Sequence, residues 1–186
     1  MSTEGSEEAP GTGLATRSAG PADVTALVEM VQSAYRGEGG PGRWTTEAHL
    51  VRGRRTSPAE VLEAINAGRS TVLVAEDERG LLVSCHVRDI GGGGAYLGMF
   101  AVRPGQQGRG VGRAMMAAAE AWVAGRWGCR QVEMHVIAGR DELLAWYDRL
   151  GYRPTGRTIA FPYDRDDDVP LRPGLHFVVL EKTLIP

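Results

Sequence analysis

Hydrophobic positions recur with a helical spacing in two stretches of the N-terminal part of the chain. The first stretch begins near Asp23 and ends at Gly37, and one face of the expected helix collects its apolar and aromatic side chains. These are Val24, Leu27, Val28, Val31 and Tyr35. The second stretch starts at Ser57-Pro58-Ala59-Glu60, which combines the spacing of a capping box with a proline at the first helical position, and ends at Gly68. The pattern therefore predicts two amphipathic helices before the first long strand.

After Gly68 the hydrophobic positions alternate with polar ones, as in strands, and two later stretches again show the helical spacing. The expected elements, in chain order, are strands at 70–76, 81–88 and 95–102, a helix at 110–126, a strand at 131–137, a helix at 141–150, and strands at 152–160 and 175–183. In the strand at 131–137 the apolar residues face one side, whereas Glu133 and His135 face the other. This order predicts one mixed α/β domain over residues 16–186, preceded by a disordered polar tail at 1–15.

The charge balance narrows the classes of partner. The 186 residues include 21 basic and 23 acidic side chains, for a formal net charge of −2, which argues against nucleic acid or a membrane surface as partner. The acidic run at 164–168 is typical of a polar loop, although it could attract a cationic substrate. Because no apolar run approaches the roughly 18 residues of a membrane span and no signal-peptide core is present, we expect a cytoplasmic protein.

Histidine and cysteine do not indicate a metal centre. The four histidines show no ligand spacing, and the two cysteines, Cys85 and Cys129, stand apart in apolar surroundings. We therefore expect no metal cofactor and two reduced core thiols rather than a disulfide. His49 and His176 have no matching partners and are expected to be structural.

The stretch at 102–113 carries the clearest chemical signal, because a glycine-rich turn joins an expected strand to an expected helix. Glycines at 108, 110 and 112 remove side chains that would keep a phosphate from the unpaired N–H groups at a helix start. A dinucleotide fingerprint is excluded because Met115 occupies its third glycine position, and a Walker A loop is excluded because no lysine follows. The pattern predicts a site for a phosphorylated cofactor, with a flexible surface loop as the alternative.

Two motifs give the chain a family resemblance. Gln107-Gly108-Arg109-Gly110-Val111-Gly112 reads Q-x-x-G-x-G and resembles the pyrophosphate-binding motif of the GNAT acyl-CoA transferases. Leu144-Ala145-Trp146-Tyr147-Asp148-Arg149-Leu150-Gly151-Tyr152 is similar to the signature of the same family in which the tyrosine points at the coenzyme sulfur. The order of expected elements also matches. One departure is Arg140, which stands where the family often carries an asparagine.

The resemblance implies a fold and a co-substrate. The implied fold is a central, mostly antiparallel, twisted sheet of six to seven strands, flanked by about four helices and splayed between the strands at 95–102 and 131–137. The implied co-substrate is acetyl-CoA, with its pantetheine along the first of these strands and its diphosphate in the loop. The residues expected to hold it are Phe100, Ala101, Val102, Gln107, Gly108, Arg109, Gly110, Val111, Gly112, Arg113, Arg140 and Trp146.

The implied reaction is acetyl transfer to the amine of a small molecule, by direct attack in a ternary complex. Tyr147 is the candidate general acid for the departing thiolate, with structural packing between helix and sheet as the alternative. Since a tyrosine pKa of about 10 exceeds a thiol pKa of about 8.5, a hydrogen bond to the sulfur is as reasonable as full proton transfer. The general base stays open, because the strand at 95–102 contains no acidic residue. The candidates are Glu47, His86, Glu133 and His135.

The acceptor site is expected around Trp44, Thr46, Glu47 and His135. Trp44 and Glu47 together could hold an organic cation through an aromatic face and a carboxylate, although Thr45 or Thr46 could instead cap a short helical turn. Two rival functions stay open: an acyl-CoA-binding regulatory protein without turnover, and an acetyltransferase for protein N-termini or lysines. The sequence leaves open the acceptor, the use of other acyl groups and the oligomeric state, for which a homodimer is one alternative.

Overall fold

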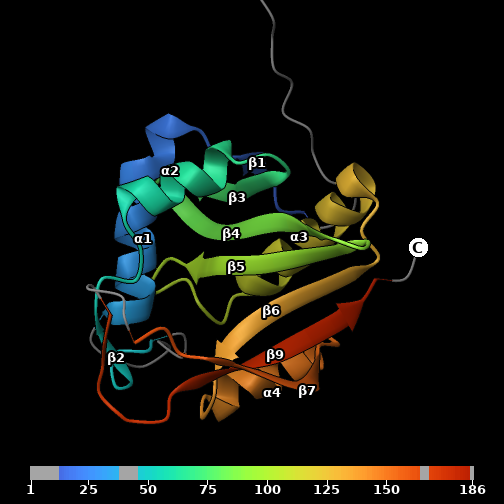
Figure 1. Ribbon diagram of the computed structural model, residues 1–186. Helices are drawn as coiled ribbons and strands as arrows, with labels where there is room; N and C mark the ends of the chain where they lie inside the picture. The colour runs from blue at the N-terminus through green and yellow to red at the C-terminus, as the bar shows by residue number, and fades with distance from the viewer. Residues whose placement is uncertain (1–12, 38–45, 164–167, 185–186) are drawn as a thin grey trace, which may run out of the picture.

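A seven-stranded sheet forms the centre of the computed structural model, which describes residues 13–37, 46–163 and 168–184 (Figure 1). Its strand order is β1-β3-β4-β5-β6-β9-β7, and a second sheet pairs β2 with β8. The strands are β1 (Arg17–Ser18), β2 (Val51–Gly53), β3 (Ser70–Asp77), β4 (Gly80–Gly91), β5 (Gly94–Val102), β6 (Gln131–Ile137), β7 (Arg153–Ala160), β8 (Asp168–Pro170) and β9 (His176–Thr183). The helices are η1 (Pro21–Asp23), α1 (Val24–Arg36), α2 (Pro58–Asn66), α3 (Val111–Trp127) and α4 (Asp141–Arg149).

The predicted mixed α/β fold is therefore confirmed, and every predicted helix and strand is present within a few residues of its expected bounds. The elements that the sequence pattern missed are β1, β2, β8 and η1, which span two or three residues each. A hydrophobic period cannot be recognised over so few positions. Cys85 and Cys129 are both buried free thiols, as expected.

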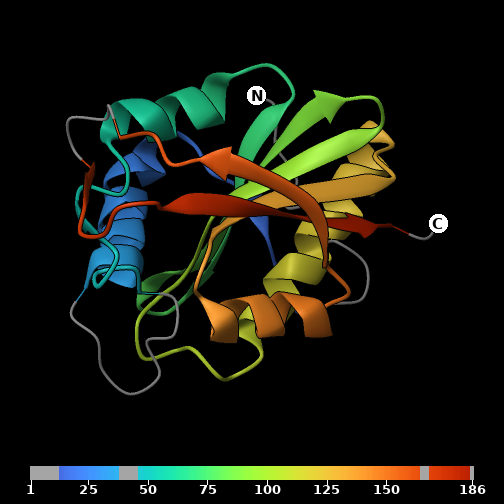
Figure 2. The same cartoon turned by 60° about the horizontal axis from the view of Figure 1, so that its bottom comes forward.

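Helices cover both faces of the sheet (Figures 1 and 2). Alternation along β3 makes this possible, because Val72 and Val74 join the core cluster under α1 and α2, whereas Leu73 and Ala75 join the cluster on the opposite face with α3 and α4. The inward face of α1 differs slightly from the prediction, since it is centred on Leu27, Met30, Val31 and Ala34. Tyr35 is consequently only half-buried and borders a cavity.

The expected splay of the sheet is present between β5 and β6. These two strands pair in parallel from Gly94↔Gln131 to Leu97↔Met134 and then diverge, whereas the other strand pairs of the sheet are antiparallel. Just beyond the last pair, the β4–β5 register shifts between Ser84 and His86, and Met99 adopts a φ of 45°. A bulge with a left-handed non-glycine residue is a strained feature of the kind that concentrates at functional sites.

A half-buried histidine, His86, gives the fold a pH-dependent stability. Ser70 Oγ donates to the carbonyl of Ala64 at 2.7 Å, so the His86 Nε2 at 2.8 Å from that oxygen is its N–H donor. Burial, and secondarily the charge of Arg88, lowers the pKa of His86 to about 4. In the unfolded chain the imidazole takes up its proton below about pH 6.5, so protonation favours unfolding between about pH 6.5 and 4.

We expect the free energy of unfolding to fall by about 3 kcal/mol, through His86 alone, as the pH drops from 7 to 4. Urea unfolding at both pH values measures this loss in the wild-type protein and in His86→Gln, which should lack the His86 contribution. His176→Gln is the matched control, because His176 is exposed. The same pH-dependent loss in both variants would contradict the assignment.

Candidate functional site

Two cavities border the divergent end of β5. The smaller, of about 250 Å³, is called the inner cavity, and the larger, of about 790 Å³, is called the loop cavity because the glycine-rich turn lines it. Met99 and Phe100 face the inner cavity and Val102 faces the loop cavity. Helix α4 lies between the two cavities, since Tyr147 lines the inner cavity and the adjacent residue Trp146 lines the loop cavity. Two neighbouring side chains of one helix thus face different cavities.

The loop cavity has the backbone geometry of an anion site. Gly108 and Gly110 both have a φ of 81°, a left-handed conformation that other residues adopt only with strain. Gly110 is the N-cap of α3, a helix of 17 residues, so the first N–H groups and the positive end of the helix dipole face this end of the cavity. The lining residues are Val102, Gln107, Gly108, Gly110, Gly112, Arg113, Glu142, Ala145, Trp146 and Arg149.

Gly112 has a packing role beside the loop. A Cβ atom at this position would lie 3.3 Å from Phe100 Cζ and 3.5 Å from Trp146 Cζ2. These two rings stack with their centroids 5.7 Å apart. The absence of a side chain at Gly112 therefore lets the first turn of α3 pack directly against these two rings. Phe100 lines the inner cavity and Trp146 lines the loop cavity, so the ring pair lies between the two cavities.

Five of the predicted cofactor residues do not line the loop cavity: Phe100, Ala101, Arg109, Val111 and Arg140. Arg109 lines a separate surface hollow with Asp77 and Arg79, and Ala101 is fully buried beneath α1 and α2. Phe100 and Arg140 line the inner cavity rather than the loop cavity, so Arg140 lies away from the glycine-rich turn.

Arg149 is a cation of the loop cavity that sequence reasoning missed. It shares one face of α4 with Glu142, Ala145 and Trp146, all of which line the same cavity. The helical spacing of these positions is the signal that could have identified it. Together with Arg113 of α3, it places two exposed guanidinium groups around the glycine-rich turn.

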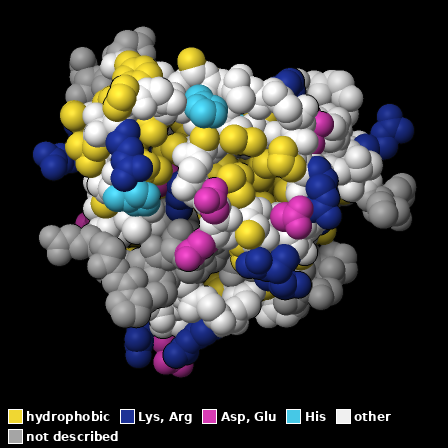
Figure 3. Space-filling view, turned by 90° about the horizontal axis from the view of Figure 1, so that it is seen from below, with side chains coloured by type: hydrophobic (Ala, Val, Ile, Leu, Met, Phe, Trp, Pro, Cys, Tyr) yellow, Lys and Arg dark blue, Asp and Glu magenta, His cyan; other side chains and the backbone are white. Residues whose placement is uncertain are grey.

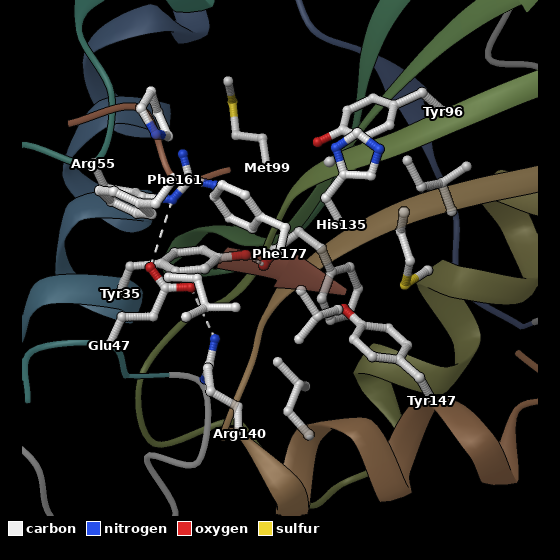
Figure 4. Close-up of a pocket in the computed structure, with 18 of the residues that line it drawn as sticks. Tyr35, Glu47, Arg55, Tyr96, Met99, His135, Arg140, Tyr147, Phe161 and Phe177 are labelled. Carbon is white, nitrogen blue, oxygen red and sulfur yellow. Dashed lines mark hydrogen bonds and ion pairs between the residues drawn. The ribbon is translucent and has the colours of Figure 1, made fainter. Parts of the chain in front are cut away.

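Aromatic rings and a charged cluster form the inner cavity (Figure 4). The aromatic members are Tyr35, Tyr96, Phe100, Tyr147, Phe161 and Phe177, and the charged members are Arg36, Glu47, Arg55 and Arg140. They come from α1, the segment before α2, β5, α4 with its N-cap Arg140, and the chain around β7 and β9. The sequence predicts four of these residues as site residues: Tyr147, Glu47, Phe100 and Arg140. No local sequence motif predicts the other aromatic and charged residues of the inner cavity.

Glu47 is held at the centre of the charged cluster. Its Oε2 accepts a hydrogen bond from Arg36 at 2.8 Å, and its Oε1 accepts one from Arg140 at 2.9 Å. Arg55 Nε lies 3.9 Å from the same carboxylate. The Glu47 side chain is 7% exposed, and those of Arg36 and Arg140 are 6% and 4% exposed. The expectation that Glu47 holds an organic cation is therefore revised, because buried guanidinium groups already neutralise it.

Tyr147 presents its hydroxyl to the inner cavity (Figure 4). The residue is only 5% exposed, and its ring packs edge-on against Trp146 and Tyr152, with centroids 4.9 Å and 5.8 Å away. Burial raises the pKa of Tyr147 well above its ordinary value. The hydroxyl consequently stays protonated around neutral pH and can act as a hydrogen-bond donor.

His135 also lines the inner cavity, and Glu133 orients it. His135 Nε2 lies 2.8 Å from Glu133 Oε1, and Arg157 donates to the other Glu133 oxygen at 2.5 Å. Although burial opposes it, hydrogen bonds from Arg157 and His135 lower the pKa of Glu133, so this carboxylate is charged. When Nε2 donates to Glu133, Nδ1 carries the lone pair that can accept a proton. The other candidate bases, Glu133 and His86, do not line the cavity.

The remaining predicted acceptor residues do not join this arrangement. Thr46 Oγ1 donates to the carbonyl of Gly37 at 2.9 Å and accepts from the backbone of Ala48 at 3.3 Å, which favours the alternative of a local cap. With His49, Thr46 lines a small separate hollow. Trp44 lies outside the described residues.

Within the described ranges, no helix is long and apolar enough to cross a membrane. The same ranges hold no cluster of three potential metal-binding side chains from His, Cys, Asp and Glu.

Known proteins resemble this chain in sequence and in fold. Residues 68–154 match the family model of the acetyltransferase (GNAT) domain. A mycothiol acetyltransferase from Tsukamurella paurometabola is 29% identical over 150 residues, which make up 78% of this chain and 50% of that protein. The chain thus spans about half the length of this curated relative.

Solved structures agree on the fold. The ribosomal-protein-S18-alanine N-acetyltransferase from Escherichia coli has a TM-score of 0.66 at 16% identity, over 92% of this chain and 94% of that one. Spermidine/spermine N-acetyltransferase SpeG from Vibrio cholerae has a TM-score of 0.62 at 13% identity, over 91% of this chain and 92% of that one. At such identities, the likeness extends to the fold and no further.

Proposed function

We propose that the chain is a GNAT acetyltransferase that transfers an acetyl group from acetyl-CoA to the amine of a small molecule, since residues 68–154 match the family model of the acetyltransferase (GNAT) domain. The observation that carries this proposal is the pair of cavities around α4. Trp146 borders the cavity with the anion-binding turn, and Tyr147 borders the cavity that can hold an acceptor. A cofactor extending from one cavity to the other would bring its reactive end to Tyr147.

The loop cavity fits the phosphorylated part of coenzyme A. The left-handed glycines, the start of α3 and the two arginines Arg113 and Arg149 suit a diphosphate. Beyond Leu97, β5 has no β6 partner among the described residues, so this stretch of β5 could pair on that side with an amide-containing chain, although the Phe100 carbonyl already accepts a hydrogen bond from Tyr35 Oη at 2.7 Å. When bound, acetyl-CoA would supply an activated thioester carbonyl.

Tyr147 would assist the departure of the sulfur. Proton donation from a tyrosine with an ordinary pKa of about 10 to a thiolate with a pKa of about 8.5 is uphill by about 2 kcal/mol. Burial raises the Tyr147 pKa further, which makes full transfer still less favourable. We therefore assign Tyr147 the role of hydrogen-bond donor to the leaving sulfur as the C–S bond breaks.

His135 is our candidate general base. The acceptor amine must lose a proton as its nitrogen forms the new C–N bond, and His135 Nδ1 can take that proton while Nε2–H remains bonded to Glu133. Glu133 acts as a positioning residue that fixes the tautomer, and Arg157 holds Glu133 in turn. This assignment replaces Glu47, whose two oxygens accept hydrogen bonds from Arg36 and Arg140.

The shape of the inner cavity favours a small acceptor over a polypeptide. Its volume of about 250 Å³ lies near the lower end of small-molecule sites, and elements from both halves of the chain surround it. A purely regulatory acyl-CoA-binding protein would have no need of a hydroxyl donor and an oriented histidine in the same cavity. The arrangement therefore supports an enzyme acting on small amines.

Calorimetric titration of acetyl-CoA tests the cofactor assignment. In Gly110→Trp the indole would enter the loop cavity, and we expect the affinity for acetyl-CoA to fall by at least about tenfold. Gly156→Trp is the matched control, because Gly156 in β7 has a φ of 82°, as Gly110 has 81°, and neither has an atom within 4 Å of an added Cβ. Both variants carry similar backbone strain, and only Gly110 lines the loop cavity.

An absence of binding by the wild-type protein, or equal weakening in both variants, would overturn the cofactor assignment. With binding established, release of CoA on addition of small amines tests the transferase activity itself. A protein that binds acetyl-CoA tightly but releases CoA with no amine would instead fit the regulatory alternative.

A further inference from the structure

Tyr96 of β5 presents to the inner cavity a hydroxyl group that the proposed reaction does not use. Figure 4 shows its ring beside His135, with the hydroxyl directed into the cavity. The centroids of the two rings are 5.0 Å apart. Tyr96 is half-buried, and among the hydrogen bonds between described residues none involves its hydroxyl. This hydroxyl is thus available to a bound molecule next to the proposed base.

Gly98 lets the ring of Tyr96 lie along its own strand. Side chains two residues apart in a strand point to the same face, so a side chain at position 98 would compete with the ring for space. A Cβ atom on Gly98 would lie 2.6 Å from Tyr96 Cε1 and 2.8 Å from its hydroxyl oxygen, which is too close for a real side chain. Gly98 also follows directly on the last β5–β6 pair, Leu97↔Met134. The hydroxyl therefore lies where the two strands begin to diverge.

Neighbouring side chains hold the Tyr96 ring in this orientation. The ring of His86 lies edge-on to it, with centroids 6.4 Å apart, and the guanidinium of Arg88 lies 5.6 Å from its centroid. Burial raises the pKa of Tyr96, so the phenol stays protonated around neutral pH. A neutral hydroxyl does not compete with His135 for a proton, but its oxygen can accept a hydrogen bond.

The chemistry of acetyl transfer requires two groups of this kind around the nitrogen of a primary amine. As the neutral amine attacks, the C–N bond forms, and the C–S bond breaks to release the thiolate of CoA. One N–H proton passes to His135 and then to the thiolate or to solvent, whereas the second N–H remains on the nitrogen and becomes the amide N–H of the product. A secondary amine has only the N–H that His135 removes, and carries an alkyl group in place of the other.

We infer that Tyr96 selects primary amines, because its hydroxyl oxygen accepts a hydrogen bond from the N–H that the acceptor retains while His135 takes the other proton. The inference rests on the proposed transferase function, since it names the class of amine for the same cavity. Primary and secondary ammonium groups carry the same charge, and acidic and basic side chains are interspersed on the end of the molecule seen in Figure 3. Discrimination between them therefore has to arise from contacts within the cavity.

Matched pairs of primary and N-methylated amines test this selectivity. We would measure kcat/KM for acetyl-CoA-dependent CoA release with 2-phenylethylamine, ethanolamine and L-alanine, each against its N-methyl derivative. In every pair that the wild-type protein acetylates, the primary amine should be preferred by about 10- to 100-fold, the range expected for a hydrogen bond to a nitrogen that develops positive charge.

Tyr96→Phe is the variant that assigns the preference to the hydroxyl. It removes one oxygen and leaves the ring contacts with His86 and His135 in place. The kcat/KM of the primary amine should fall by about 10- to 100-fold, and that of the N-methyl amine should stay within about threefold. Tyr163→Phe is the matched control, because the Tyr163 hydroxyl accepts a hydrogen bond from the Leu175 backbone at 2.8 Å and does not line the cavity. Its two values should equal those of the wild-type protein.

The inference and the proposed function fail in different ways. If Tyr96→Phe accelerates the N-methyl amine and leaves the primary amine unchanged, the hydroxyl excludes the methyl group only by its size. An equal loss for both amines would show that the hydroxyl does not recognise the second N–H, and so would equal rates for both amines in the wild-type protein. Each of these results overturns the role of Tyr96 and leaves the transferase function standing. If acetyl-CoA binds and no amine releases CoA, the transferase function is wrong, and the role of Tyr96 is wrong with it.

Discussion

Replacing Tyr147 with phenylalanine should lower kcat by about 10²- to 10³-fold, within the range seen when a positioned acid or a hydrogen-bond donor to a developing charge is removed. The substitution deletes one oxygen from a residue that is 5% exposed and leaves its ring contacts with Trp146 and Tyr152 in place. Because Tyr147 faces the inner cavity and not the loop cavity, the affinity for acetyl-CoA measured by calorimetry should stay within about threefold of wild type.

Tyr152→Phe is the matched control for this experiment. It removes a hydroxyl that donates to Glu120 at 2.8 Å, away from both cavities. Losing that hydrogen bond should lower the free energy of unfolding by about 1 kcal/mol while kcat is retained. Equal rates in wild type and Tyr147→Phe would show that Tyr147 is a packing residue, which was the alternative reading of the sequence.

The pH dependence of the wild-type rate provides an independent check on Tyr147. A raised pKa means that the phenol keeps its proton up to a pH above its ordinary value of about 10. Loss of activity below about pH 10 should therefore not originate from Tyr147. If the rate of the wild-type protein declines at pH 8–9 and that of Tyr147→Phe does not, Tyr147 loses its proton in this range. That result would contradict the conclusion that burial raises the Tyr147 pKa.

The parts of the site that could be predicted from sequence are those encoded by neighbouring residues. The glycine-rich turn places its own backbone at a helix start, so spacing alone identified the loop cavity at Gly108, Gly110 and Gly112. Alternation in β6 likewise placed Glu133 and His135 on one face, where they form a hydrogen bond. Such relations follow from the period of a single element.

The charged cluster could not be predicted because its members are distant in sequence. Glu47 meets Arg36 across 11 residues and Arg140 across 93 residues, and no spacing rule links these positions. Without its partners, Glu47 looked like a carboxylate free to bind a cation. The fold reverses that interpretation, because α1, the segment before α2 and the start of α4 meet at this point and surround it with guanidinium groups.

Glu47→Gln should destabilise the protein more than it slows the reaction. The carboxylate compensates two guanidinium groups that are 6% and 4% exposed, and breaking a buried ion pair from one side typically costs about 3–5 kcal/mol. For a chain of this length, a loss of about 3 kcal/mol corresponds to a fall in Tm of roughly 6–12 °C. Urea unfolding and calorimetric melting of wild type and variant measure the effect.

A surface carboxylate provides the comparison for Glu47. Asp148 pairs with Arg153 at 2.5 Å, but the two side chains are 60% and 63% exposed, so Asp148→Asn should change the free energy of unfolding by less than about 1 kcal/mol. Similar losses of unfolding free energy in Glu47→Gln and Asp148→Asn would mean that solvent or other groups compensate the charge of the buried arginines. Glu47 would then not be needed to stabilise the cluster.

The kinetics of Glu47→Gln, measured at a temperature where it remains folded, separate the two assignments of the base. If His135 accepts the amine proton, kcat should stay within about tenfold of wild type, whereas loss of a true general base would lower it by about 10²- to 10⁴-fold. If Glu47→Gln keeps the stability of the wild-type protein but loses 10²-fold or more in kcat, the general base is Glu47. His135 would then be only a polar residue that lines the cavity.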